Sequence, residues 1–306
     1  MNEKNNYIDA LEELMNSKDI SEEEKINLNR IKNKKTNIMI TGATGCGKSS
    51  TINALFNIEK AKVGTGVDPE TMDITKYELD NLTLWDSPGL GDGKEADEKH
   101  VKNIIEKLKE PGEDKGTLID LVLVIVDGSS RDLGTSYELI NKVIIPNLGE
   151  RTKERILIAI NQADMAMKGR YWNNEKNCPE EELKRFLDEK VTSIKNRIKD
   201  STGLDVEPIY YSAGYTEADV KQNPYNLSKL LYYIMKSIPK DNMLSIIANT
   251  NKDENRWKYN EWEYYEENNE FFKFFNEFFE EFFQDTMFGK FVGAVGRVMD
   301  FFRGLF

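Results

Sequence analysis

Between residues 36 and 240, short apolar runs alternate with longer stretches in which apolar residues recur at helical spacing. This alternation is typical of an α/β domain in which a mostly parallel sheet lies between two layers of helices. The run LVLVIV at 121–126 has no polar face, which predicts a central strand buried on both sides. We expect strands at 37–41, 74–79, 82–86, 118–126, 156–161 and 206–212, and helices near 48–57, 95–109, 132–146, 179–200 and 225–237.

The first 35 residues form a polar region that precedes this pattern. Ile8 and Leu11 begin an apolar series at helical spacing, and Ser21 followed by Glu24 has the form of a capping box that opens a second helix. We therefore predict that residues 1–35 form a helical extension that packs on the main domain.

Residues 241–306 differ in composition from the rest of the chain, because 13 of the 15 Phe lie after residue 270. Phe recurs at helical spacing through 271–283, between acidic residues, and a second apolar stripe with Lys and Arg on its opposite face runs through 288–306. For 271–283, packing on the rest of the chain is favoured over membrane contact, because anionic lipid repels its acidic flanks. For 288–306, docking on the domain, self-association and peripheral contact with a membrane all stay open.

The charge and the rare residue types exclude several classes of protein. With 54 acidic and 42 basic residues, the formal charge is -12, which argues against DNA and also against RNA or a ribosome as partners, because phosphate backbones are bound by clustered Lys and Arg. A single His, His100, and two distant Cys, Cys46 and Cys178, exclude a Cys/His zinc cluster and a disulfide framework. Without an apolar leader or a membrane-spanning run, we expect a cytoplasmic protein, with peripheral membrane contact left open.

The segment 42–49, Gly-Ala-Thr-Gly-Cys-Gly-Lys-Ser, matches the phosphate-binding pattern G-x-x-x-x-G-K-[ST] in full. It follows a predicted strand and precedes a predicted helix, the context in which glycines let backbone N–H groups surround a phosphate. Lys48 is expected to place its charge on the β- and γ-phosphates, and the Ser49 hydroxyl to ligate Mg²⁺. The residues expected to contact the nucleotide here are Ala43, Thr44, Gly45, Cys46, Gly47, Lys48, Ser49 and Ser50.

A second segment, Asp-Ser-Pro-Gly at 86–89, suits the γ-phosphate and its metal ion. Asp86 ends a predicted strand 37 positions after Ser49 and is placed to hold Mg²⁺ through water. The backbone N–H of Gly89 is placed to contact a γ-phosphate.

A threonine between these two motifs is expected to ligate Mg²⁺ and to be released on hydrolysis. Thr71 is preferred, with Thr65 and Thr75 as the alternatives. The candidate metal ligands are therefore Ser49, Thr71 and Asp86, and the candidate catalytic residues are Lys48, Thr71 and Gly89.

Two loops after later strands suit recognition of a purine base. Residues 161–164, Asn-Gln-Ala-Asp, follow a predicted strand, and the Asp164 carboxylate can accept two hydrogen bonds from the edge of guanine. Adenine would be rejected, because the wrong base leaves buried polar groups unpaired. The loop after the next strand is placed to offer a backbone N–H to the base oxygen. The candidate base-binding residues are Asn161, Gln162, Asp164, Ser212 and Ala213.

Taken in order, GATGCGKS, Thr71, DSPG, NQAD and SAG resemble the motifs of the translation-factor-class (TRAFAC) P-loop GTPases, nearest the Era-like branch. The motif string is also similar to that of small prophage- and defence-associated bacterial GTPases. The resemblance covers residues 36–240, about two-thirds of the chain. It implies binding of GTP, GDP and Mg²⁺, slow hydrolysis of GTP, and a three-layer fold around a mostly parallel sheet.

Three positions depart from that family's pattern. Gln162 stands where the family carries a Lys whose aliphatic stem covers the guanine plane, which predicts weaker binding. Leu90 stands where many members carry a water-positioning Gln, so hydrolysis should be slow unless a partner, a second subunit or another group supplies the missing chemistry. Gly45 stands where potassium-stimulated members carry Asn, so we expect no potassium activation. In the loop after the central strand, Arg131 and Asp132 can contribute in trans, although solvated loop charges are the favoured interpretation.

Together these features predict a GTP-hydrolysing molecular switch. Its nucleotide state is expected to control contacts with a partner, with a second copy of the chain in a homodimer or larger assembly, or with a membrane, through the helices of 241–306. The alternative is a GTP-binding scaffold that hydrolyses poorly and acts by assembly through the same region. Leu90 and Gln162 favour this alternative.

Overall fold

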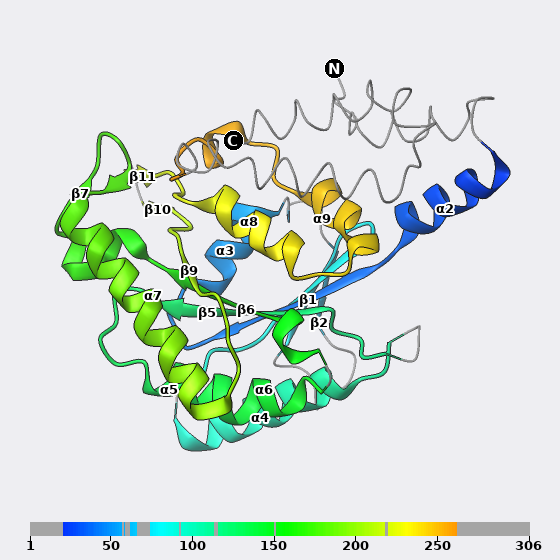
Figure 1. Cartoon of the computed structure of the whole chain (residues 1–306), viewed down its shortest axis with the longest axis horizontal. Coiled ribbons are helices and arrows are strands. Elements are labelled where there is room, and N and C mark those ends of the chain that lie inside the picture. Colours follow the sequence, from blue (N-terminus) through cyan, green and yellow to red (C-terminus); the bar gives the residue numbers. More distant parts are fainter. Residues whose placement is uncertain are drawn as a thin grey trace.

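The computed structural model describes residues 21–56, 58, 62–65, 74–91, 93–112, 116–149, 151–217 and 220–261. Thr71, the apolar series that begins at Ile8, and the Phe-rich segments 271–283 and 288–306 lie outside these residues. The described chain begins with helix α2 (Glu22–Asn33), which leads into the first strand of the sheet (Figure 1).

Seven strands form one sheet, in the order β2-β3-β4-β1-β5-β6-β9. The last five pair in parallel, whereas β2 and β3 at one edge pair antiparallel. The strands are β1 (Thr36–Gly42), β2 (Lys62–Thr65), β3 (Thr75–Glu78), β4 (Leu82–Asp86), β5 (Leu121–Asp127), β6 (Ile156–Asn161) and β9 (Ile209–Tyr210). The carboxyl ends of the five parallel strands therefore meet at one edge of the sheet, where the predicted motif loops begin.

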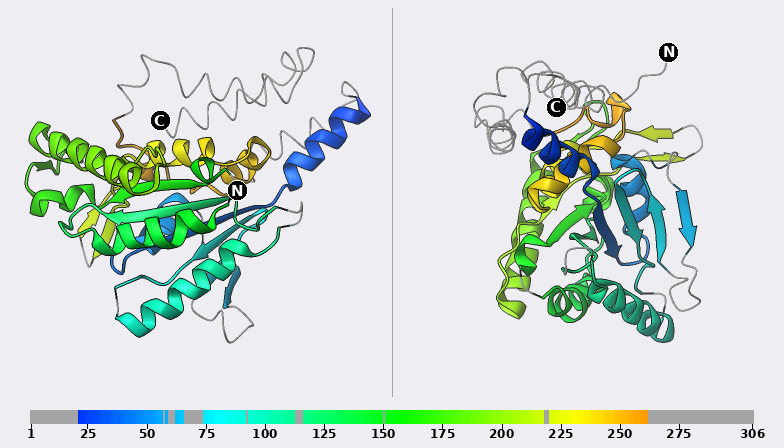
Figure 2. Two further views of the ribbon diagram at one scale, coloured as in Figure 1. Left: turned by 60° about the horizontal axis from the view of Figure 1, so that its bottom comes forward. Right: turned by 90° about the vertical axis from the view of Figure 1, so that its right-hand side faces the viewer.

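The central strand β5 shows why the domain has three layers. Its alternate residues enter two separate hydrophobic cores, Leu121, Leu123 and Ile125 in one and Val122, Val124 and Val126 in the other. The first core is covered by α3 (Lys48–Leu55), α8 (Leu227–Lys236) and α9 (Met243–Asn249). The second is covered by α4 (Lys94–Lys109), α5 (Gly134–Glu138), a π-helical turn (Leu139–Ile144), α6 (Ile145–Asn147) and α7 (Glu181–Thr202). Figures 1 and 2 show the two helical layers on opposite faces of the sheet, which confirms the predicted three-layer α/β fold.

The elements that differ from the sequence-based expectation are short. Only Ile209–Tyr210 of the predicted strand 206–212 pairs with β6, because the chain then turns into the loop of the SAG motif. Two hairpins without a predicted counterpart flank that region. They are β7 (Trp172–Asn173) with β8 (Cys178–Pro179), and β10 (Tyr215–Glu217) with β11 (Val220–Gln222). Strands of two or three residues contain too little alternation to be recognised from a pattern.

Residues 243–261 pack on this domain. Every residue of α9 is buried, and Asn251 N donates to Leu55 O at 2.8 Å just after it. Trp257 is 1% exposed and its indole Nε1 donates to Asn251 O at 2.9 Å. A domain boundary at 240 stays a prediction, while the helix that follows it contributes to the first core. None of the helices in the described ranges is long and apolar enough to cross a bilayer.

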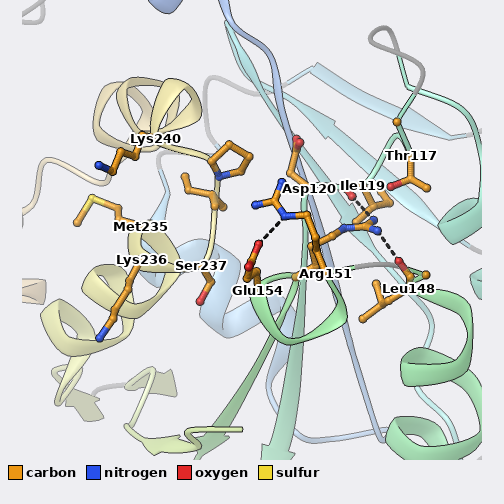
Figure 3. Close-up of a pocket in the computed structure, with 15 residues that line it drawn as sticks. Thr117, Ile119, Asp120, Leu148, Arg151, Glu154, Met235, Lys236, Ser237 and Lys240 are labelled. Carbon is orange, nitrogen blue, oxygen red and sulfur yellow. Dashed lines mark hydrogen bonds and ion pairs between the residues drawn. The ribbon is translucent and has the colours of Figure 1, made fainter. Parts of the chain in front are cut away.

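A cavity of about 730 Å³ lies at the amino ends of the strands, opposite the motif loops (Figure 3). The Asp120 carboxylate accepts the N–H of Asn37 at 2.7 Å, and the Arg155 guanidinium donates to two backbone carbonyls at 2.5 and 2.6 Å. Arg151 pairs with Glu154 at 2.5 Å. Because these charges satisfy one another or the backbone, we interpret the cavity as part of a structural ion network.

Asp120→Asn is expected to stabilise the protein at neutral pH. Burial raises the pKa of Asp120 from 3.8 to about 6, so ionisation costs free energy in the folded state that the unfolded chain does not incur. The amide keeps an acceptor for the Asn37 N–H. The gain should grow from near zero at about pH 4 to about 1–3 kcal/mol above pH 6, measured by urea unfolding across that range. The exposed Asp200→Asn is the control, and a gain that did not vary with pH would contradict this explanation.

Candidate functional site

The phosphate loop joins β1 to α3, and its shape depends on Gly47. This residue is the N-cap of α3 with φ 89°, and it leaves the first N–H groups of the helix without a side-chain cap. A Cβ here would collide with the side-chain amide of Asn161. Lys48 Nζ donates to the carbonyls of Gly42 and Ala43 at 3.3 and 3.2 Å. The loop thus combines uncapped N–H groups, a helix N-terminus and an ammonium group, which is a combination suited to phosphate.

The side chain of Cys46 packs beneath this loop. It is fully buried, and burial raises the pKa of the thiol to about 11, so it stays protonated at neutral pH. Close by, Thr51 Oγ1 and Tyr211 Oη share a buried hydrogen bond of 2.5 Å. The Cys46 side chain is therefore part of the packing beneath the loop and is not an activated nucleophile.

Ser49 and Asp86 meet beside the loop, as the spacing of their motifs predicts. The Ser49 hydroxyl donates to Asp86 Oδ2 at 3.1 Å. Asp86 Oδ1 is buried and has no hydrogen-bond partner, and burial raises the pKa of this carboxyl although Ser49 and Lys48 oppose the shift. A buried carboxylate oxygen without a partner next to a hydroxyl fits a hard divalent cation such as Mg²⁺. Thr71, the third candidate ligand, lies outside the described residues.

Gly89 and Leu90 continue from β4 along the phosphate loop. Leu90 N donates to Gly42 O at 3.4 Å, and Thr44 N donates to Leu90 O at 2.9 Å. The Leu90 side chain is 5% exposed and belongs to the second core. Gly89, the candidate γ-phosphate contact, therefore lies directly against the phosphate loop.

Asn161 connects the phosphate loop with the loop that follows β9. Its Nδ2 donates to Cys46 O at 3.0 Å, and its Oδ1 accepts the N–H of Ala213 at 2.9 Å. The side chain is 2% exposed, so both halves of the amide are engaged inside the protein. Asn161 thus positions two loops, and the Ala213 N–H, expected to meet the base, is bonded to Asn161.

Asp164 supplies the acceptor at the candidate base site. It is 5% exposed, and its burial raises the pKa of the carboxyl, while a hydrogen bond from Ser212 and backbone N–H groups oppose that shift. A nearly buried carboxylate of this kind gains most from a ligand that brings two N–H donors to it, as the edge of guanine does.

Gln162 reaches back over the phosphate loop. Its Nε2 donates to Gly45 O at 2.8 Å, and its Oε1 lies 3.3 Å from Ser129 Oγ. Asp127 Oδ1 in turn accepts Ser129 N and Oγ, both at 2.7 Å. No sequence motif marks Ser129, and its one sequence signal is its place just after the carboxyl end of β5.

The charges proposed to act in trans lie in the same loop. Asp132 Oδ1 accepts the N–H of Gly134 at 2.9 Å, which closes a local turn, and Arg131 is exposed. These observations support the interpretation of Arg131 and Asp132 as solvated loop charges.

Residues 37–162 match the family model described as 50S ribosome-binding GTPase. Among curated proteins, the T-cell-specific guanine nucleotide triphosphate-binding protein 2 of Mus musculus is 40% identical over 87 residues, which cover 26% of this chain and 21% of that protein. The uncharacterized protein YfjP of Escherichia coli (strain K12) is 32% identical over 133 residues, 42% of each chain. The chain thus spans less than half the length of these relatives.

Among solved structures, Toc33 from Arabidopsis thaliana in complex with GDP and Mg²⁺ is similar with a TM-score of 0.41 and 14% identity, over 67% of this chain and 85% of that one. A probable GTP-binding protein EngB is similar with a TM-score of 0.39 and 23% identity, over 66% and 98%. Because both TM-scores are below 0.5, neither similarity adds to the sequence match or to the fold described above.

Gln162→Ala is expected to weaken GDP binding about three- to tenfold, because it removes one hydrogen bond that closes the base side of the phosphate loop. Gln162→Lys should restore the affinity, because an ammonium group can donate to the Gly45 carbonyl across the same span. Titration with a fluorescent GDP analogue measures both. Gln222→Ala, at a glutamine outside the motif loops, is the control. Equal GDP affinity of Gln162→Ala and the unaltered chain would contradict the role given to the hydrogen bond from Gln162 to Gly45.

The sequence motifs and the contacts between their loops lie at one edge of the sheet. The loops after β1, β4, β6 and β9 lie together there, and Asn161 and Gln162 bond the base-side loop to the phosphate loop. The family match ends at residue 162 and so includes the first two of these loops and the start of the third. The chain thus carries a P-loop GTPase domain, within which residues 37–162 match the family model.

Proposed function

We propose that this protein is a Mg²⁺-dependent, slowly hydrolysing GTP switch of the Era-like branch that acts in the cytoplasm. The observation that carries the proposal is the pairing of Ser49 with Asp86, whose second oxygen is buried without a partner beside a complete phosphate loop. Lys48 would place its charge on the β- and γ-phosphates, and Gly89 would offer its N–H to the γ-phosphate. Ser49, Asp86 and Thr71 would hold Mg²⁺, which would neutralise charge that develops on the phosphates.

We expect the region whose contacts change with nucleotide state to lie beyond residue 261. Tyr210, the last residue of β9, and Tyr211, which follows it, have different partners. The Tyr211 hydroxyl hydrogen-bonds to Thr51 of α3, and the Tyr210 hydroxyl donates to Glu261. Lys229 Nζ also lies 3.1 Å from the Glu261 carboxylate. The last described residue is thus fixed to the strand that leads into the base loop. This arrangement supports coupling between the nucleotide and the Phe-rich region, whose contacts with a partner, a second copy or a membrane would change with nucleotide state.

The alternative is a scaffold that binds GTP, hydrolyses it poorly and acts by assembly. The burial of Leu90 favours a low intrinsic rate but does not decide between the two. Phosphate release by the purified chain distinguishes them, since the scaffold predicts nucleotide-dependent assembly without turnover.

Asp164→Asn is expected to shift the preference of the protein from GTP toward XTP. The asparagine amide offers one donor and one acceptor, which matches the xanthine edge and leaves a guanine N–H without its acceptor. GTP turnover should fall at least about a hundredfold, and XTP should recover much of it. Lys48→Ala is the comparison, and it should lose turnover of both GTP and XTP. Equal loss of GTP and XTP in Asp164→Asn would contradict the assigned base contact.

The coupling is tested on the full chain with GDP and with a non-hydrolysable GTP analogue. Sedimentation and vesicle flotation should differ between the two nucleotides in the unaltered protein. Glu261→Gln should reduce that difference while GDP affinity stays within about twofold, because the change weakens the pair with Lys229 far from the phosphates. Glu254→Gln, an exposed acid in the same segment, is the control. Sedimentation and flotation that are the same with either nucleotide would contradict the switch output.

A further inference from the structure

The side chain at position 90 cannot reach a nucleotide in this fold. Leu90 is 5% exposed in the second core, and both its backbone N–H and its carbonyl bond to the phosphate loop. To turn its side chain toward the phosphates, the loop would have to break these bonds and expose the core. A residue other than the one at position 90 must therefore orient water if the domain hydrolyses GTP.

Helix α4 fixes the same loop from its other side. A ring nitrogen of His100, Nδ1, lies 3.3 Å from Gly89 O, and Asp97 Oδ1 accepts the N–H of Gly91 at 2.9 Å. Three consecutive residues are thus held, 89 and 91 by α4 and 90 by the phosphate loop. The position of Gly89 relative to the phosphate loop is consequently well determined.

Thr44 is the side chain that lies against Gly89. A Cβ built on Gly89 would lie 2.6 Å from Thr44 Cα and 2.7 Å from Thr44 N, and it would also collide with Thr44 Oγ1. Thr44 is exposed at the mouth of the phosphate loop. Within the described part of the chain its hydroxyl has no hydrogen-bond partner, although its backbone N–H is engaged. The hydroxyl is therefore available beside the N–H that would contact a γ-phosphate.

Two other polar side chains near this loop are already committed. Ser87 is 2% exposed and its hydroxyl donates to Thr41 Oγ1 at 2.8 Å. His100 uses Nδ1 on the carbonyl of Gly89. Both side chains are thus engaged by the protein.

We propose that the Thr44 hydroxyl orients the attacking water, in place of the side chain withdrawn at position 90. This inference rests on the proposed GTPase function. The water oxygen would bond to the γ-phosphorus as the bond from that phosphorus to the β,γ-bridging oxygen breaks. GDP would leave with that electron pair, and the water proton would pass to the released phosphate. Thr44 Oγ1 accepts a hydrogen bond from the water and holds it in line, and it takes no proton itself.

The test compares Thr44→Val with Thr44→Ser in the full chain. Valine keeps the shape without the hydroxyl, and serine keeps the hydroxyl without the methyl group. Single-turnover hydrolysis with Mg²⁺ should slow about tenfold in Thr44→Val, which corresponds to the loss of one neutral hydrogen bond, and should stay within about threefold in Thr44→Ser. The dissociation constant for GDP should change much less than this rate in both variants, because the hydroxyl lies beside Gly89, the candidate contact of the γ-phosphate, which GDP lacks.

The outcomes separate this inference from the function on which it rests. Hydrolysis by Thr44→Val at the rate of the unaltered chain would overturn it. A matching loss of GDP affinity would overturn it too, because Thr44 would then serve binding. Failure of the unaltered chain to release phosphate would overturn the proposed function itself.

Leu90→Gln provides a second, independent test. Because this side chain lies in the core, the glutamine amide should be buried, so the variant should unfold at a lower temperature and should hydrolyse GTP no faster than the unaltered chain. A faster rate would show that position 90 can reach the water, and it would overturn the role assigned to Thr44.

Discussion

The site depends on the side-chain amide of Asn161. One residue at the end of β6 bonds through its side chain to the loops after β1 and β9, and its backbone carbonyl accepts the N–H of Gly128 after β5 at 2.7 Å. Three loops far apart in the sequence are thereby fixed relative to one another. The glycine at position 47 follows from the same constraint, because any side chain there would occupy the place of the amide. The phosphate loop and the candidate base loops are therefore parts of one hydrogen-bonded unit.

Much of this arrangement could be predicted because the chemistry lies at the ends of parallel strands. A buried strand such as 121–126 is recognised from its own residues, and the topology then brings the loops after successive strands to one edge. The same reasoning predicts that Ser49 lies near Asp86, and the two side chains are hydrogen bonded.

The other features of the site could not be predicted from the sequence, because they depend on contacts between residues that are far apart in it. The absence of a glutamine at position 90 is visible in the sequence, but the two backbone bonds that keep Leu90 in the core depend on strand register. Likewise, Glu261 reads as one acid among many in an acidic region until its pairing with Tyr210 and Lys229 is seen. Ser129 has no sequence signature either, because its hydroxyl meets Asp127 and lies near Gln162 only once the loops after β5 and β6 are folded together.

The carboxylates of Asp86, which is partly buried, and Asp164, which is buried, relate the stability of the candidate site to its expected function. Asp86 and Asp164 are both held where burial raises the pKa of the carboxyl, so each ionised side chain costs free energy in the protein alone. The same desolvation strengthens the interaction of each with a complementary group, a cation at Asp86 and paired N–H donors at Asp164. The unfolded chain offers neither environment, so nucleotide and metal should favour the folded state more than their contacts with exposed acids would. The free-energy cost of each carboxylate in the protein alone and its expected preference for a complementary ligand therefore have one origin, which is desolvation by burial.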